Sequence, residues 1–402
     1  MVSSPDRGLS NGLTPTESRA LKAIAVQFWV NGAVVASYVP RLPGIRDKLG
    51  LDLATIGILM AVATGFGLIG SGIQSPIIER VGTKRAMLGG ATMLVLMLPL
   101  VGFVTTPWTL LLVLGVLSIS DVVTDVAMNM QGSVLSNRRD TPVMQRLHAM
   151  WSIGTVVGGV VASLMAAIDL DLRVHLVVAA IVLAISLSYV APGLLTHDDD
   201  VVSNAPSATR STASATGVVL TFAALGGAAI IPEMINSDWA AFRLTDDLGT
   251  SAGVAGVAYV AFTSGMVSGR LAGDWVVERL GGNVVLRRAT LLAAVGILLA
   301  TLIPSTAAVF VGLFIAGLGV SVMFPQLYDA AAQHQRPGKA LGGLTAGSRA
   351  ALLGAPLAVG FMANSSAITV GGAIAIATVP SALLVWFLSL RLSGHSVKSA
   401  DH

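Results

Sequence analysis

Long apolar runs alternate with short polar breaks along the chain. A run of about 20 apolar residues is long enough to cross the ~30 Å hydrocarbon layer of a membrane as a helix. Such runs predict twelve membrane-spanning helices, with expected limits of 20–40, 54–75, 86–105, 108–133, 147–168, 173–192, 216–237, 252–271, 287–304, 307–331, 340–362 and 367–390. The pattern therefore predicts an all-α membrane protein.

The residue composition supports the same class. Of the 402 residues, 54% are hydrophobic and 11% are charged, whereas soluble domains average roughly 45–50% apolar and 25% charged residues. The chain has no cysteine, which excludes disulfides, thiolate metal sites and cysteine nucleophiles. The formal net charge of +3 is explained by where the basic residues fall, so we expect membrane lipid, and not nucleic acid, as a partner.

The basic residues are distributed unequally between the two sides of the predicted bundle. Placing both termini in the cytoplasm puts 18 of the 24 Lys and Arg residues on the cytoplasmic side and one, Arg349, inside a span. The five on the outer side are Arg41, Arg46, Lys48, Arg173 and Arg243. Because cytoplasmic loops carry such an excess, we predict this orientation.

The chain is predicted to consist of two similar halves. Residues 196–215 are rich in Ser, Thr and Ala and have no periodic apolar face, which indicates a flexible cytoplasmic linker. An E-R-x-G motif begins at Glu79 and again at Glu278, 199 positions later, and glycines at 50 and 249, 57 and 256, and 70 and 269 share this offset. The predicted organisation is a cytoplasmic tail (1–19), two six-helix halves (20–195 and 216–391) joined by the linker, and a second tail (392–402).

The loop after the second predicted span resembles the signature of the major facilitator superfamily, G-x-x-x-D-R-x-G-R-[RK]. The corresponding residues are Ser75, Glu79, Arg80, Gly82, Thr83 and Lys84, of which Arg80 and Gly82 match. Four further stretches, RLPGIRDKLGLDLATIGILM, DVAMNMQG, HAMWSIG and EMINSDWAAF, resemble the bacterial YbjJ-like branch of that superfamily. The resemblance implies the major facilitator fold of twelve transmembrane helices in two six-helix halves, in a monomer of the bacterial inner membrane.

The fourth predicted span carries three polar residues on one helical face. Asp121, Asp125 and Asn129 are spaced four residues apart in DVVTDVAMNM, so their side chains follow one another along the helix. A charged residue at the centre of a bilayer costs about 2.5–3.5 kcal/mol on insertion scales, which argues against a lipid-facing position. We expect these side chains to line an aqueous cavity, where a carboxylate that exchanges a proton could couple transport to protons. The alternative is that Asp121 only bonds to a neighbouring helix.

Further polar residues occur in the first and tenth predicted spans. They are Gln27, Asn31 and Tyr38 in the first and Gln326, Tyr328 and Asp329 in the tenth. In the superfamily that the chain resembles, the first, fourth, seventh and tenth helices line the central cavity, which implies a role in substrate binding or proton coupling. Alternatively, the amides join helices through hydrogen bonds worth ~1 kcal/mol each.

The seventh predicted span ends in a polar cluster that follows a proline. Pro232 is predicted to bend the helix near Glu233, Asp238 and Trp239. Bent helices expose backbone groups to ligands in transporters, so these three residues are candidates for the site. A polar cluster at a helix end also arises from ordinary exposure to solvent.

Arg349 is the only basic residue predicted to lie deep within a span. Its guanidinium stays protonated and requires a partner there. We expect that partner to be Asp329, Asp125, Glu233 or an anionic group of the cargo. A purely structural ion pair is the alternative.

The two E-R-x-G loops carry clustered charges. The resemblance implies that these residues form a cytoplasmic gate, latched by charge pairing; they are Glu79, Arg80, Lys84, Asp274, Glu278 and Arg279. An excess of basic residues at the cytoplasmic helix ends would by itself also account for these loops.

Together these features favour a secondary active carrier that alternates access by rocking one half against the other. The sequence has no G-x-x-x-x-G-K-[ST] loop for ATP and no H-E-x-x-H metal pattern, so neither an enzyme nor a cofactor is expected. Proton coupling and a small, polar, sugar-like cargo are favoured. Efflux of drugs or metabolites, and a non-transporting receptor or scaffold, are the alternatives.

Overall fold

The computed structural model describes residues 14–137, 143–196 and 216–392. Residues 197–215 of the predicted linker lie outside the described residues. So do residues 1–13 of the first predicted tail and 393–402 of the second. Helices account for nearly all of the described residues. Their bounds are α1 Pro15–Tyr38, η1 Val39–Arg41, α2 Leu42–Leu49, α3 Leu53–Phe103, α4 Pro107–Asn137, α5 Met144–Ala167, α6 Leu172–Val190, α7 Thr216–Phe242, η2 Arg243–Asp247, α8 Ala252–Leu280, α9 Gly282–Leu302, α10 Thr306–Val320, α11 Met323–Ala332, α12 Pro337–Ala363 and α13 Val370–Leu392.

Several helices begin at a side chain that accepts a hydrogen bond from the first turn. Thr14 and Glu17 form a reciprocal capping box at the start of α1. Asp52 accepts from the backbone N–H of Thr55 at 2.7 Å before α3, and these hydrogen bonds lower the pKa of the Asp52 carboxyl. Such caps satisfy N–H groups that have no partner within the helix.

Eleven helices in the described part of the chain are long and apolar enough to cross a membrane. The predicted count of twelve is not confirmed, because the 51 residues of α3 contain all of one predicted span, 54–75, and most of the next, 86–105. The backbone of α3 leaves helical geometry at Gly82, where φ is 81° and ψ is 161°. Lys48, just before α3, donates from Nζ to the carbonyl oxygen of Gly102 at 2.8 Å. The two ends of α3 are therefore close together, and the helix folds back at Gly82.

Glycines that are 199 positions apart adopt matching backbone conformations. Gly50 and Gly249 have φ values of 62° and 63°, and Gly82 and Gly281 have φ values of 81° and 80°. Positive φ is readily accessible only to glycine. The same turns therefore occur at equivalent places in the first and second parts of the chain.

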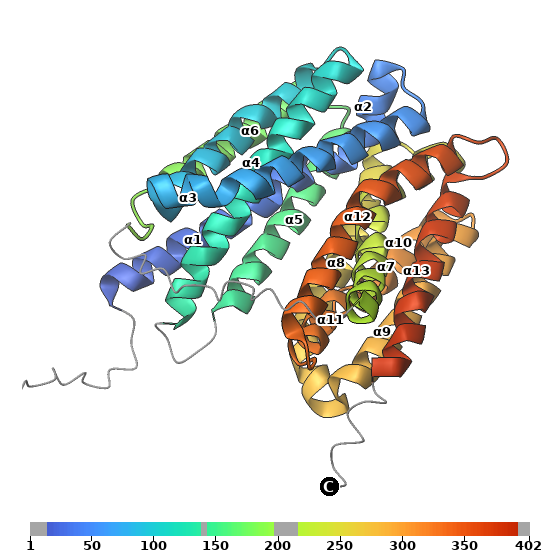
Figure 1. Cartoon of the computed structure of the whole chain (residues 1–402). Coiled ribbons are helices and arrows are strands. Elements are labelled where there is room, and N and C mark those ends of the chain that lie inside the picture. Colours follow the sequence, from blue (N-terminus) through green and yellow to red (C-terminus); the bar gives the residue numbers. More distant parts are fainter. Residues whose placement is uncertain (1–13, 138–142, 197–215, 393–402) are drawn as a thin grey trace, which may run out of the picture.

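The helices form two groups, α1–α6 and α7–α13 (Figure 1). The groups approach each other near α2 and α12 and diverge toward the end at which α11 lies (Figure 1). We call these the α2 end and the α11 end. The outer surface is strongly apolar: Leu96, Ile185 and Leu271 are 59%, 65% and 70% exposed. Exposed apolar surface of this kind fits contact with lipid.

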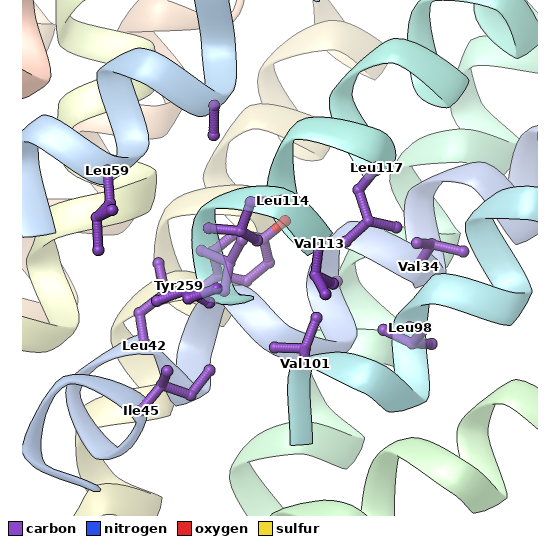
Figure 2. Packing of buried hydrophobic residues seen from close by; sticks show 14 of the residues in the cluster. Val34, Leu42, Ile45, Leu59, Leu98, Val101, Val113, Leu114, Leu117 and Tyr259 are labelled. Carbon is purple, nitrogen blue, oxygen red and sulfur yellow. The ribbon is translucent and has the colours of Figure 1, made fainter. Parts of the chain in front are cut away.

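One hydrophobic cluster joins the two groups. It contains side chains of α1–α4 and α6 together with Trp239 and Phe242 of α7 and Tyr259 of α8. Figure 2 shows part of this cluster, in which Tyr259 is surrounded by side chains of the first group, including Leu42 of α2. Two further clusters each lie within one group. The apolar contact between the groups is therefore concentrated toward the α2 end.

Small residues allow the two groups to approach closely. Gly57 of α3 lies against the backbone of Pro356 and Gly360 in α12. On the other side of the bundle, Gly256 of α8 lies against Ser163 of α5. Membrane helices pack by van der Waals contact at such positions, so a larger side chain at either glycine would push the groups apart.

An ion pair also connects the groups at the α2 end. Both terminal nitrogens of Arg46 in α2 donate to the carboxylate of Asp246 in η2. The Arg46 guanidinium lies 5.3 Å from the ring centroid of Phe242. The Arg46 side chain is 12% exposed and that of Asp246 is 20% exposed, so water screens this pair less than a surface pair.

We predict that Gly57→Val lowers the stability of the protein, because the added side chain meets the backbone of α12. Overpacking of this kind costs about 1–3 kcal/mol, and thermal unfolding of the detergent-solubilised protein would measure it. Gly72→Val is the matched control, since Gly72 lies on the same helix and nothing lies within 4 Å of an added Cβ there. Equal melting temperatures for the two variants would contradict close packing between α3 and α12.

Candidate functional site

The polar residues of α4 face two different environments. Asp121 accepts a hydrogen bond at Oδ1 from Nδ2 of Asn31 in α1, at 3.0 Å. Asn129 donates from Nδ2 to Oδ1 of Asp125 at 3.0 Å and to its main-chain oxygen at 2.8 Å. Asp125 is therefore bonded within its own helix, whereas Asp121 is bonded to another helix.

Asp121 lines a cavity of about 200 Å³ between the two groups of helices. Its polar lining residues are Tyr38, Thr64, Ser118, Asp121 and Asp238, and its apolar lining comes mainly from α1, α3 and α4. Asp238 is the lining residue from the second group. Carboxylates from α4 and α7 thus face one cavity from opposite groups.

A second cavity, of about 130 Å³, lies beside the first. Its lining comes from α1, α5, α7 and α8, and Val35 and Asp238 line both cavities. Its other polar and aromatic lining residues are Trp151, Ser152, Thr155, Glu233, Ser237, Tyr259, Thr263 and Arg270. The two cavities form one polar region between the groups.

Neither Asp121 nor Asp238 forms an ion pair with another described residue. Asp238 accepts a hydrogen bond from the hydroxyl of Ser237 at 3.2 Å. An ionised carboxylate without a cation is costly to bury, so these groups must be hydrated, protonated or bound to a ligand. The geometry therefore suits proton exchange or recognition of a polar solute.

Arg270 is a cavity residue that the sequence alone did not identify. It was assigned to the cytoplasmic end of a span at 252–271, but α8 continues to Leu280. The terminal nitrogen Nη2 of Arg270 lies 3.4 Å from Oε1 of Glu233, and its guanidinium lies 5.9 Å from the ring centroid of Trp151. Arg270 lies ten residues before the end of α8, and its side chain is 33% exposed.

Other predicted site residues, among them Gln27 and Trp239, line neither cavity. Gln27 is fully buried in α1, and neither atom of its amide has a hydrogen-bond partner. Trp239 is 0% exposed and packs against Phe242, with ring centroids 5.4 Å apart. Trp239 therefore belongs to the hydrophobic cluster that joins the groups.

Arg349 has a different partner from those predicted. Its side chain is exposed, and Nη1 donates to the hydroxyl of Ser71 in α3 at 2.8 Å. The predicted partners Asp329, Asp125 and Glu233 do not pair with it; Glu233 pairs with Arg270 instead. The exposed position of Arg349 explains why it does not require a carboxylate.

The predicted residues of the tenth span lie outside both cavities. The helix is interrupted after Val320, and the short α11 carries all three. Tyr328 is 44% exposed, Asp329 is exposed, and Gln326 lies against Gly282 at the start of α9. The structure places these side chains at the α11 end.

The predicted gate residues are not paired with one another in this conformation. Glu79, Arg80, Asp274, Glu278 and Arg279 are exposed, and Lys84 is partly exposed. Arg279 stacks over the ring of Trp275 at 4.0 Å. Among the described residues, the ion pair that connects the two groups is that of Arg46 and Asp246, at the opposite end.

No group of three His, Cys, Asp or Glu residues in the described ranges could hold a metal ion. The recognition chemistry of the cavities therefore rests on carboxylates, hydroxyls, aromatic rings and one guanidinium.

Comparisons with known proteins agree with this architecture. A family model described as the Major Facilitator Superfamily matches residues 24–231. An uncharacterized MFS-type transporter of Yersinia pestis is 30% identical over 353 residues, covering 87% of this chain and 90% of the relative. An uncharacterized transporter of Sinorhizobium fredii is 26% identical over 353 residues, covering 86% of this chain and 91% of the relative.

Solved structures give the same fold. A crystal structure of the nucleoside transporter NupG has a TM-score of 0.69 and 15% sequence identity, and the match covers 95% of this chain and 99% of that chain. At this identity the similarity shows the fold alone. The match to the family model and the similarity to the Yersinia relative show that this chain belongs to the major facilitator superfamily, as a membrane transporter and not an enzyme.

Proposed function

We propose that this protein is a secondary active transporter that carries a small polar solute by alternating access, coupled to protons. The observation that carries the proposal is that Asp121 of α4 and Asp238 of α7 line the same cavity between the two groups of helices. A solute bound there would contact both groups at once. Rocking of one group against the other would then change the side from which the site is open.

The moving units of the proposal are the six-helix halves 20–195 and 216–391. The 51 residues of α3 would extend about 75 Å as one straight helix, more than twice the ~30 Å membrane core. Its fold-back at Gly82 supports two crossings and hence twelve in all. The sequence stretches described above further support membership of the YbjJ-like branch.

The excess of basic residues supports a cytoplasmic α11 end, with both termini on that side, in the inner membrane of a bacterium. In that orientation the structure is closed toward the outside, where α2 and η2 meet. The ion pair of Arg46 and Asp246 and the close contact at Gly57 both support closure at this end.

The size of the cavities supports a small cargo. Their volumes of about 200 and 130 Å³ are below the roughly 300–1,000 Å³ that is typical of drug-sized ligand sites. Carboxylates and hydroxyls also suit a polar solute better than a greasy drug. The direction of transport follows from the solute and the gradient. A thermal-shift screen of metabolites, including nucleosides, would identify solutes for transport assays.

We predict that the rate of transport driven by a pH gradient falls at least tenfold in the double variant Asp121→Asn/Asp238→Asn, because amides cannot exchange a proton at this site. Uptake of a solute identified by thermal shift would be measured in proteoliposomes with and without the gradient. Asp169→Asn is the matched control, since Asp169 is exposed in the connection between α5 and α6. Gradient-driven uptake at the normal rate by the double variant would rule out coupling through these carboxylates.

We predict that Arg46→Ala shifts the protein toward conformations that are open at the α2 end, because the ion pair that connects the halves is lost. Spin labels at Thr105→Cys and Ser366→Cys, both exposed at this end, would report longer distances by pulsed electron resonance. The exchange Arg46→Asp/Asp246→Arg should restore the short distances.

Arg173→Ala is the control for this measurement. Arg173 lies at the same end, but its guanidinium stacks on Phe103 of its own half, 5.4 Å from the ring centroid. If Arg46→Ala and Arg173→Ala give the same distance distribution, the ion pair does not hold the halves together.

A further inference from the structure

The serine and threonine hydroxyls of the second cavity share one property: each lies within hydrogen-bond distance of a main-chain carbonyl oxygen of its own helix. Thr155 donates to the carbonyl oxygen of Ser152 at 2.7 Å, and Thr263 donates to that of Tyr259 at 2.8 Å. Ser152 donates to the carbonyl oxygen of His148 at 3.0 Å. Since a hydroxyl has one proton and two acceptor lone pairs, these side chains offer mainly acceptors to the cavity.

Ser237 behaves in the same way. Its hydroxyl lies 2.9 Å from the carbonyl oxygen of Met234 and 3.2 Å from Oδ1 of Asp238. Either bond uses the single proton. In the first cavity, the hydroxyl of Thr64 donates to the carbonyl oxygen of Met60 at 2.9 Å. Five of the serine and threonine hydroxyls that line the two cavities thus follow one pattern, whereas Ser118 of the first cavity makes no such bond.

The charged residues add to this excess of acceptors. Asp121, Glu233 and Asp238 line the two cavities, and an ionised carboxylate only accepts hydrogen bonds. Arg270 is the one basic side chain that lines either cavity among the described residues, and it already lies near Glu233. The remaining donors are the hydroxyls of Ser118, Tyr38 and Tyr259 and the indole of Trp151.

We propose that the solute recognised by these cavities is rich in hydrogen-bond donors, namely a polyhydroxylated compound or its amino derivative. This inference rests on the proposed transport function and specifies its substrate class. Hydroxyl or ammonium groups of such a solute satisfy the carboxylates and the free lone pairs of Thr155 and Thr263. A compound that only accepts hydrogen bonds leaves those buried acceptors unpaired, and sites of this kind discriminate strongly against it.

The test compares four sugar probes, each added to the purified full-length protein: glucose, glucosamine, fully O-methylated glucose and glucuronate. Glucose and glucosamine should raise the melting temperature at millimolar concentration, and the methylated sugar and the acid should not. If the variant Asp121→Asn/Asp238→Asn loses only the rise in melting temperature with glucosamine, the ammonium group binds the carboxylates. If it loses the rise with glucose as well, hydroxyl groups of the sugar also bind the carboxylates. Shifts that are no larger for glucose and glucosamine than for the other two probes would overturn the proposal.

Two conservative variants test the hydroxyl acceptors directly. Thr155→Val and Thr263→Val should each weaken binding of the better probe by roughly three- to tenfold. Thr301→Val is the control, because Thr301 is buried in α9, makes the same kind of bond to its own helix at 2.7 Å and lines neither cavity. Equal affinities for all three variants would contradict the proposal. Gradient-driven uptake of a solute that only accepts hydrogen bonds would also contradict the proposed substrate class, but it would agree with the proposed transport function.

Discussion

The need to accommodate two carboxylates within the membrane-spanning part of the chain constrains the whole architecture. Asp121 and Asp238 come from helices of different groups, and neither has a cationic partner among the described residues. Exposure of either to lipid would cost several kcal/mol. Both therefore face the space between the groups, which must admit water or solute. That space cannot be filled like a protein core, so the contacts that hold the groups together lie elsewhere.

Those contacts are concentrated toward the α2 end and are of three kinds, the first of which is the hydrophobic cluster that contains Trp239, Phe242 and Tyr259. Small residues such as Gly57 and Gly256 let the helices approach until their backbones touch, and Arg46 bonds across to Asp246. The carboxylates require a cavity between the groups, and the contacts at the α2 end close that cavity on one side.

The sequence predicted most of the fold but only part of the site. Apolar runs located the helices because length and hydropathy are local properties, yet the fold-back at Gly82 made two predicted spans one continuous element. Asp121 was predicted from its cost in lipid. Arg270 and Arg349 were misplaced because their exposure depends on where a helix ends and on what packs against it. Periodicity along one helix cannot supply that information. The polar residues of α11 lie in the predicted tenth span but line neither cavity, and the sequence did not predict the interruption of the helix after Val320.

The most direct test of this account is the access of water to the space between the groups. The chain has no cysteine, so single cysteines can be introduced without background. We choose Ser118, which lines the first cavity with Asp121, and Ser186, which is partly exposed on α6 next to the exposed Ile185 and lines neither cavity. In membranes, a charged, water-soluble thiol reagent should label Ser118→Cys much faster than Ser186→Cys. Labelling of Ser118→Cys that is no faster than that of Ser186→Cys would contradict an aqueous cavity between two moving halves.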